Sequence, residues 1–142
     1  MYDEKKLRRL EILRRYKQNE RTTGIYKVDE GIYDVEICTI NLKENCNQNA
    51  YIQFVCKNLS SNGPKKLYGI YYLTENTEEA SITSLRCLLG DFGYDDITDE
   101  EVIDDFAIFE RLQVLVGKNA KLVVEEQDGF LSSKVYKVIP NE

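Results

Sequence analysis

Short segments in which apolar and polar residues alternate occupy the first half of the chain. Three of them, GIYDVEICTI, AYIQFVCKNL and KLYGIYYL, lie between Gly31 and Leu73 and are separated by the polar connections NLKENCNQN and SSNGPK. Tyrosine, isoleucine, valine and phenylalanine favour strands, whereas asparagine, serine, glycine and proline favour turns. The stretch from Gly31 to Leu73 is therefore predicted to be a three-stranded meander.

The alternation also predicts which side chains of this meander face the core. The third segment is apolar on both sides, since Tyr68 and Tyr72 alternate with Leu67, Gly69 and Tyr71. A strand of this kind is either covered by another element or presents aromatic rings to a ligand. In the first two segments we expect one alternating set each to be buried, namely Tyr33, Val35 and Ile37 in the first and Ile52, Phe54 and Cys56 in the second.

Apolar residues at helical spacing begin the chain. Leu7, Leu10, Leu13 and Tyr16 recur every three positions, which predicts one apolar stripe on a helix within residues 1–23. We weigh two main uses for this helix, docking on the rest of the chain through the leucines or contact with phosphates or an acidic partner. A further use is packing on a second copy, which would give a homodimer.

Two more helices are predicted after the meander. Asn76 followed by Glu79 resembles a capping box, and apolar residues at helical spacing continue until Gly90 and Gly93 end the element. The segment Asp95–Asp105 is strongly acidic and leads into a second helical stripe. The residues of that stripe are Val102, Phe106, Phe109 and Leu112.

The end of the chain has the pattern of a β-hairpin. Two predicted strands, residues 121–126 and 133–139, flank the turn sequence QDG. We expect Val135 to point inward together with either Val138 or Tyr136, depending on the register. This hairpin supplies the fourth and fifth strands.

Together these elements predict an α+β fold that is mainly β. Five strands, with helices between the third and fourth, match the layout of a small OB-like barrel or sandwich. The 142 residues suit one domain of ordinary size. We therefore expect a basic amphipathic N-terminal helix in residues 1–23, followed by a single barrel-like domain in residues 24–142 with two helices between its third and fourth strands.

The composition narrows the possible chemistry. The chain has no histidine, which removes the usual general base near neutral pH and every Ser-His or Cys-His dyad, so we expect no enzyme activity. The four cysteines have no CxxC spacing, so we predict no metal site and no cofactor. We expect Cys38, Cys56 and Cys87 to pack in apolar surroundings and only Cys46 to be exposed.

No apolar run approaches the roughly 18 residues of a membrane span, and no segment resembles a signal peptide. We therefore expect no membrane contact and a location in the cytoplasm of the host cell. Charge is unevenly distributed: residues 1–21 carry eight Lys/Arg and four Asp/Glu, whereas the whole chain has a formal net charge of -6. The body that follows the first helix is thus strongly acidic.

Four motifs carry a resemblance to a known family. They are GIYDV at the start of the first strand, AYIQFVCKNL, SLRCLLGDFG, and LVGKNAKLVV followed by DGFLSSKVYKV. Over residues 24–139 the chain resembles small phage-borne proteins that are described as single-stranded-DNA-binding proteins of replication and recombination. The resemblance implies an OB-fold-like barrel that binds single-stranded nucleic acid, without catalysis and with little sequence preference.

A barrel of that kind needs aromatic rings on which bases stack and basic side chains along the phosphate track. The candidates for stacking are Tyr51, Tyr68 and Tyr72, and the candidates for phosphate contact are Lys57, Lys65 and Lys66. Lys134 and Tyr136 on the last strand are further candidates for the nucleic-acid site. For each tyrosine alone, ordinary packing is the simpler interpretation.

The acidic body supports a competing hypothesis. A small acidic protein of phage or mobile-element character is also suited to inhibit a host nucleic-acid-processing enzyme, in the manner of an anti-CRISPR protein, by imitating phosphates. The simpler interpretation is that these acidic residues are solvent-exposed and lie at the N-terminus of a helix, where negative charge is favourable. The candidate residues for partner binding are Asp95, Asp96, Asp99, Glu100, Glu101, Asp104 and Asp105.

Overall fold

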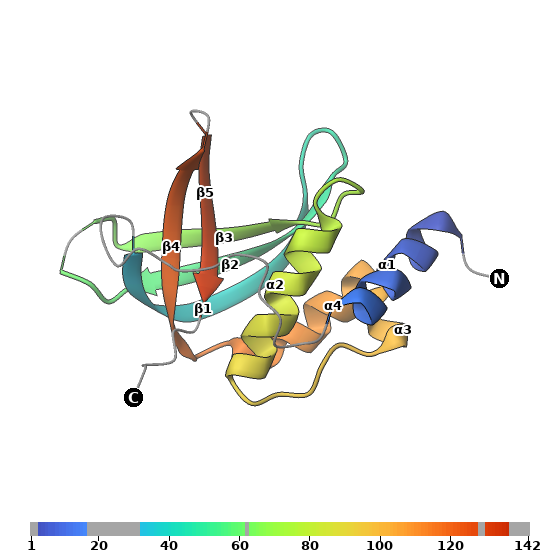
Figure 1. The fold of residues 1–142 in the computed structure, drawn as a ribbon. Helices are drawn as coiled ribbons and strands as arrows, with labels where there is room; N and C mark the ends of the chain where they lie inside the picture. The colour runs from blue at the N-terminus through green and yellow to red at the C-terminus, as the bar shows by residue number, and fades with distance from the viewer. Residues whose placement is uncertain (1–2, 17–31, 62, 128–129, 137–142) are drawn as a thin grey trace.

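A computed structural model describes residues 3–16, 32–61, 63–127 and 130–136 of the chain. The strands lie on one side of the molecule and the helices gather beyond one end of them (Figure 1). In chain order the elements are α1 (Glu4–Arg15), β1 (Ile32–Glu44), β2 (Ala50–Asn58), β3 (Lys66–Tyr72), α2 (Glu78–Asp91), α3 (Asp99–Val102), α4 (Asp105–Leu112), the 3₁₀ turn η1 (Gln113–Leu115), β4 (Asn119–Gln127) and β5 (Phe130–Tyr136).

All five strands belong to one antiparallel sheet in the order β3-β2-β1-β4-β5. The long strand β1 pairs with β2 along most of its length and with β4 near its start, so it joins the two halves of the sheet. This order, with helices between β3 and β4, is that of an OB-like barrel. The predicted fold class, α+β and mainly β, is confirmed.

The two edge strands of the sheet, β3 and β5, meet through side chains. The Tyr71 hydroxyl donates to the carbonyl of Val135 at 2.9 Å and accepts from its amide at 2.8 Å. Gly69 permits this approach, because a Cβ atom there would lie only 2.8 Å from Cγ2 of Val135. We call this join, made by Gly69, Ile70 and Tyr71 with Lys134 and Val135, the β3–β5 seam.

The core contains the residues expected of β2, since Ile52, Phe54 and Cys56 are fully buried. On β1 the alternation shifts at a bulge between Ile37 and Thr39. The extra residue lets Ile37 and Ile40 both point inward. Cys38 is the extra residue of the bulge and is exposed, as its position next to the inward Ile37 requires, so our expectation that this cysteine packs in the core was wrong.

Helix α2 packs at one end of the barrel and is buried on most sides. It begins one residue later than expected, because its N-cap is Thr77 rather than Asn76 and no side chain caps the first turn. The helix also continues through Gly90. It ends after Asp91, where Gly93 adopts a positive φ of 84°.

The acidic segment forms the starts of two short helices instead of one. Thr98 and Glu101 form a capping box at α3, and the Asp104 side chain caps α4. Ile108 faces the core, whereas Phe106 is 55% exposed and does not belong to the buried stripe that we expected. The other members of the predicted stripe are confirmed, since Val102 and Leu112 are fully buried and Phe109 packs against the core.

Helix α1 docks on α2, α3 and α4, with Leu10 and Ile12 in the same buried cluster as the barrel core. The expected stripe is only partly right, since Leu7 is 55% exposed and Arg9 is fully buried in its place. Arg9 can be buried because its Nε donates a hydrogen bond to the carboxylate of Glu78 at 2.7 Å.

No helix among the described residues is long and apolar enough to cross a membrane.

Candidate nucleic-acid interface

The side chains of β1, β2 and β3 that alternate with the core residues form one outward surface, which we call the tyrosine face. Strand register places them in rows across the sheet, because directly paired residues on neighbouring strands point to the same side. The members of the tyrosine face are Glu36, Thr39, Asn41 and Lys43 on β1, Tyr51, Gln53, Val55 and Lys57 on β2, and Lys66, Tyr68, Ile70 and Tyr72 on β3.

Three of the predicted tyrosines come together on this surface. Tyr51 pairs with Tyr72 across β2 and β3, and their ring centroids lie 5.2 Å apart with the planes tilted by 46°. Tyr72 is 36% exposed and Tyr68, four residues earlier on β3, is 45% exposed. Large exposed rings on a sheet give flat surfaces on which nucleobases can stack.

Lysines lie at both ends of the tyrosine face. At one end Lys43 pairs with Tyr51, and at the other end Lys57 pairs with Lys66, with the exposed Lys65 one residue before β3. Tyr51 and Lys57 are six residues apart on β2, or about 20 Å, since a strand residue advances the chain by ~3.3 Å. A single acid, Glu36, pairs with Lys57 on this surface.

Lys43 and Asn41 are parts of the surface that the sequence analysis missed. The connection NLKENCNQN looked like a loop, whereas β1 continues through it to Glu44. The signal was present in Ile40 and Leu42, which resume the alternation one residue out of phase after the bulge.

The structure places the other predicted basic contact, Lys134, in the β3–β5 seam. Its Nζ donates to the carbonyl of Ile70 at 2.9 Å and lies 4.3 Å from the centroid of the Tyr71 ring. Burial lowers the pKa of this ammonium group from 10.5 to about 8. The backbone of Tyr136 pairs with Lys121, and its side chain lies outside the described part of the chain.

Most of the acidic residues proposed for partner binding have internal partners. Asp96 accepts two hydrogen bonds from Arg86, at 2.8 and 2.7 Å. Glu101 completes the capping box with Thr98, and Asp104 caps the first turn of α4. These carboxylates act as caps and ion-pair partners within the protein, so they are poorly placed to imitate a row of phosphates.

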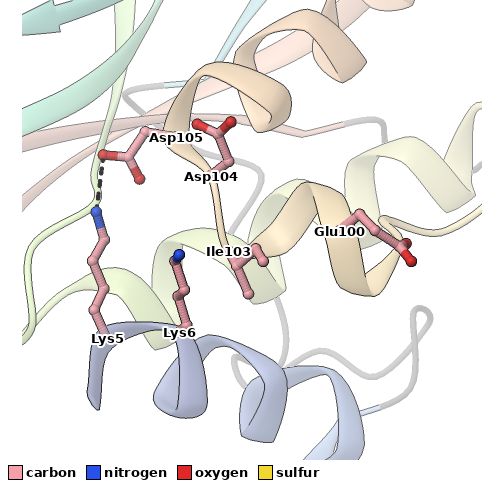
Figure 2. Close-up of a pocket in the computed structure, with 6 residues that line it drawn as sticks. All are labelled: Lys5, Lys6, Glu100, Ile103, Asp104 and Asp105. Atoms are coloured by element: carbon pink, nitrogen blue, oxygen red, sulfur yellow. Dashed lines mark hydrogen bonds and ion pairs between the residues drawn. The ribbon is translucent and has the colours of Figure 1, made fainter. Parts of the chain in front are cut away.

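Asp105 is also engaged, because Arg9 and Lys5 lie 2.9 and 3.4 Å from its oxygens. Beside this cluster is a hollow of about 390 Å³ between α1 and the α3–α4 turn. Figure 2 shows Lys5 reaching Asp105 across it, with Lys6 on the same side as Lys5. The hollow is lined by Lys5, Lys6, Glu100, Ile103, Asp104 and Asp105.

Both signs of charge therefore face each other in this hollow, which lowers its net potential. The remaining acids of the segment, Asp95, Asp99 and Glu100, are exposed. Within the described ranges no group of three or more Cys, Asp or Glu side chains is arranged to hold a metal ion. Among the described residues, the tyrosine face is thus the best candidate for a binding surface.

A scan against protein-family models finds no match for this chain, and no curated protein sequence matches it. The resemblance of its motifs to phage single-stranded-DNA-binding proteins rests on the sequence alone.

Proposed function

We propose that this protein binds single-stranded nucleic acid, DNA in the first instance, on the tyrosine face and performs no catalysis. The observation that carries the proposal is the gathering of Tyr51, Tyr68 and Tyr72 on one outward surface, with lysines at both of its ends. Stacking on such rings contributes about 1 to 3 kcal/mol per base, and lysines hold the phosphates on either side. This agrees with the function implied by the phage-protein resemblance.

The acidic character of the chain is compatible with this function because the charges are segregated. Asp96 and Asp105 face arginines or lysines at the helical end, and Glu78 accepts from Arg8 and Arg9. The tyrosine face carries Lys43, Lys57 and Lys66 but only Glu36 as an acid. At 0.1 M salt the Debye length is about 10 Å, so acidic residues farther than this from a bound polyanion repel it only weakly.

Fluorescence anisotropy with labelled oligo-dT at low salt tests the proposal. We expect saturable binding by the wild type and weaker binding by Tyr51→Ala and Tyr72→Ala, by about 5- to 150-fold each, from the stacking free energy lost. The matched control is Phe106→Ala, because Phe106 is an exposed aromatic residue on α4, away from the tyrosine face.

Two results would overturn the proposal. One is the absence of binding by the folded wild type at tens of micromolar protein and low salt. The other is an equal loss of binding in the Tyr72→Ala and Phe106→Ala variants, which would show that the tyrosine face is not the site. Binding of a basic host enzyme that survives Tyr51→Ala but is lost in Asp99→Asn/Glu100→Gln would favour the inhibitor hypothesis.

A further inference from the structure

Two side-chain amides lie at the centre of the tyrosine face. Asn41 on β1 pairs with Gln53 on β2, which in turn pairs with Ile70 on β3. Along β2, Gln53 lies two residues from Tyr51 and two residues from Val55, the partner of Tyr68. A base stacked on the Tyr51–Tyr72 pair or on Tyr68 would therefore have its edge near these amides.

The amide pair keeps unused hydrogen-bonding capacity. Asn41 Nδ2 donates to Gln53 Oε1 at 3.5 Å, which is at the long limit for a hydrogen bond. Within the described part of the chain neither side chain makes another hydrogen bond, so both protons of Gln53 Nε2 and the oxygen of Asn41 are available. Both residues are half-buried, so these groups are only partly hydrated.

An adjacent donor and acceptor complement an amino group beside a ring acceptor, a pattern that cytosine presents on one edge, N4 with N3, and adenine on two. Adenine presents an amino group beside an acceptor nitrogen on two edges, N6 with N1 and N6 with N7, and asparagine and glutamine pair with the N6/N7 edge in protein–DNA complexes. Guanine presents two acceptors, O6 and N7, on the corresponding edge. Adenine also offers a two-ring surface for stacking.

We propose that the tyrosine face selects adenine, with Gln53 donating to a ring nitrogen and Asn41 accepting from the N6 amino group. This inference rests on the proposed function, since it assigns base selection to the same surface. It departs from the sequence-neutral binding that the family resemblance implies. Asn41 and Gln53 are then specificity-determining residues, whereas the tyrosines and lysines supply affinity for any single strand.

The test is anisotropy of the full chain with labelled oligo-dA, oligo-dC and oligo-dT of equal length. We expect the wild type to bind oligo-dA about tenfold or more tightly than oligo-dT, which is the scale of one good bidentate base contact. Asn41→Leu/Gln53→Met keeps the side-chain shapes, and should bind all three strands equally at the wild-type affinity for oligo-dT. Asn76→Leu is the matched control, because Asn76 is an exposed amide outside the tyrosine face.

The outcomes separate this inference from the proposed function. Equal wild-type affinity for the three strands overturns adenine selection and leaves single-strand binding standing, even if the double variant fails to fold. A preference for oligo-dA that persists in the folded double variant also overturns the role of the amides. Binding of none of the strands rejects the proposed function itself.

Discussion

At the scale of single residues, the buried arginine on α1 is the least expected feature of the molecule. Arg9 is fully buried and donates to Glu78, to the carbonyl of Val102 at 3.0 Å and to the carbonyl of Leu73 at 3.2 Å. It thereby connects α1, α2, α3 and the end of β3. A buried guanidinium is tolerated only when its donors are satisfied in this way.

Replacing Arg9 by alanine should lower the free energy of unfolding by about 3 to 5 kcal/mol, because Glu78 would remain buried without its closest partner. Urea denaturation followed by circular dichroism measures the change. Arg14→Ala on the exposed side of the same helix is the control, and we expect it to change stability by at most about 0.5 kcal/mol. Equal effects of the two substitutions would contradict the role assigned to Arg9.

At the scale of elements, the sequence predicted what alternation and spacing encode. The core residues of β2, the order of strands and helices, and the inward direction of Val135 all follow from local pattern. The bulge at Cys38 does not, because one extra residue shifts the phase of β1 and its far end then resembles a polar loop. This is why Lys43 was missed in the candidate site.

Helix α1 shows a second limit of pattern reading. The three-residue spacing of the apolar residues predicted that Leu7 is buried, whereas the helix is rotated so that Arg9 and Ile12 face inward. The rotation depends on Glu78 and Asp105, which come from distant parts of the chain. An apolar scale applied to α1 alone contains no information about those partners.

The β3–β5 seam gives a prediction at the same scale. Gly69→Ala should lower the free energy of unfolding by about 1 to 3 kcal/mol, because the new methyl group would collide with Val135 and force the two strands apart. Chemical denaturation of Gly69→Ala, Val135→Ala and the double variant forms a double-mutant cycle. We expect the double variant to be less destabilised than the sum of the two single variants, and strict additivity would argue against a direct contact.

At the scale of the whole molecule, charge is divided between a helical end of balanced ion pairs and a sheet surface that carries lysines. For single strands, the logarithm of the binding constant falls with the logarithm of salt concentration by about 0.7 per phosphate neutralised. Three lysines on the tyrosine face, Lys43, Lys57 and Lys66, therefore predict a slope of about -2.

Each Lys→Gln substitution on the tyrosine face should reduce the size of that slope by about 0.7. Lys118→Gln serves as the control, since Lys118 is exposed in the turn before β4, outside the tyrosine face. Salt titration of oligo-dT binding by anisotropy measures the slopes. A slope that none of the three face substitutions changes would exclude these lysines as phosphate contacts.

The β3–β5 seam also shapes the way in which the barrel fluctuates. Neighbouring strands elsewhere in the sheet are held by rows of backbone hydrogen bonds, whereas the described contacts of this seam are made by the Tyr71 hydroxyl and the Lys134 ammonium. Among the described residues, this seam lacks the continuous rows of backbone hydrogen bonds that join the paired strands. We therefore expect β3 and β5 to separate more readily than the paired strands do, beside the surface where we propose that a strand of nucleic acid lies.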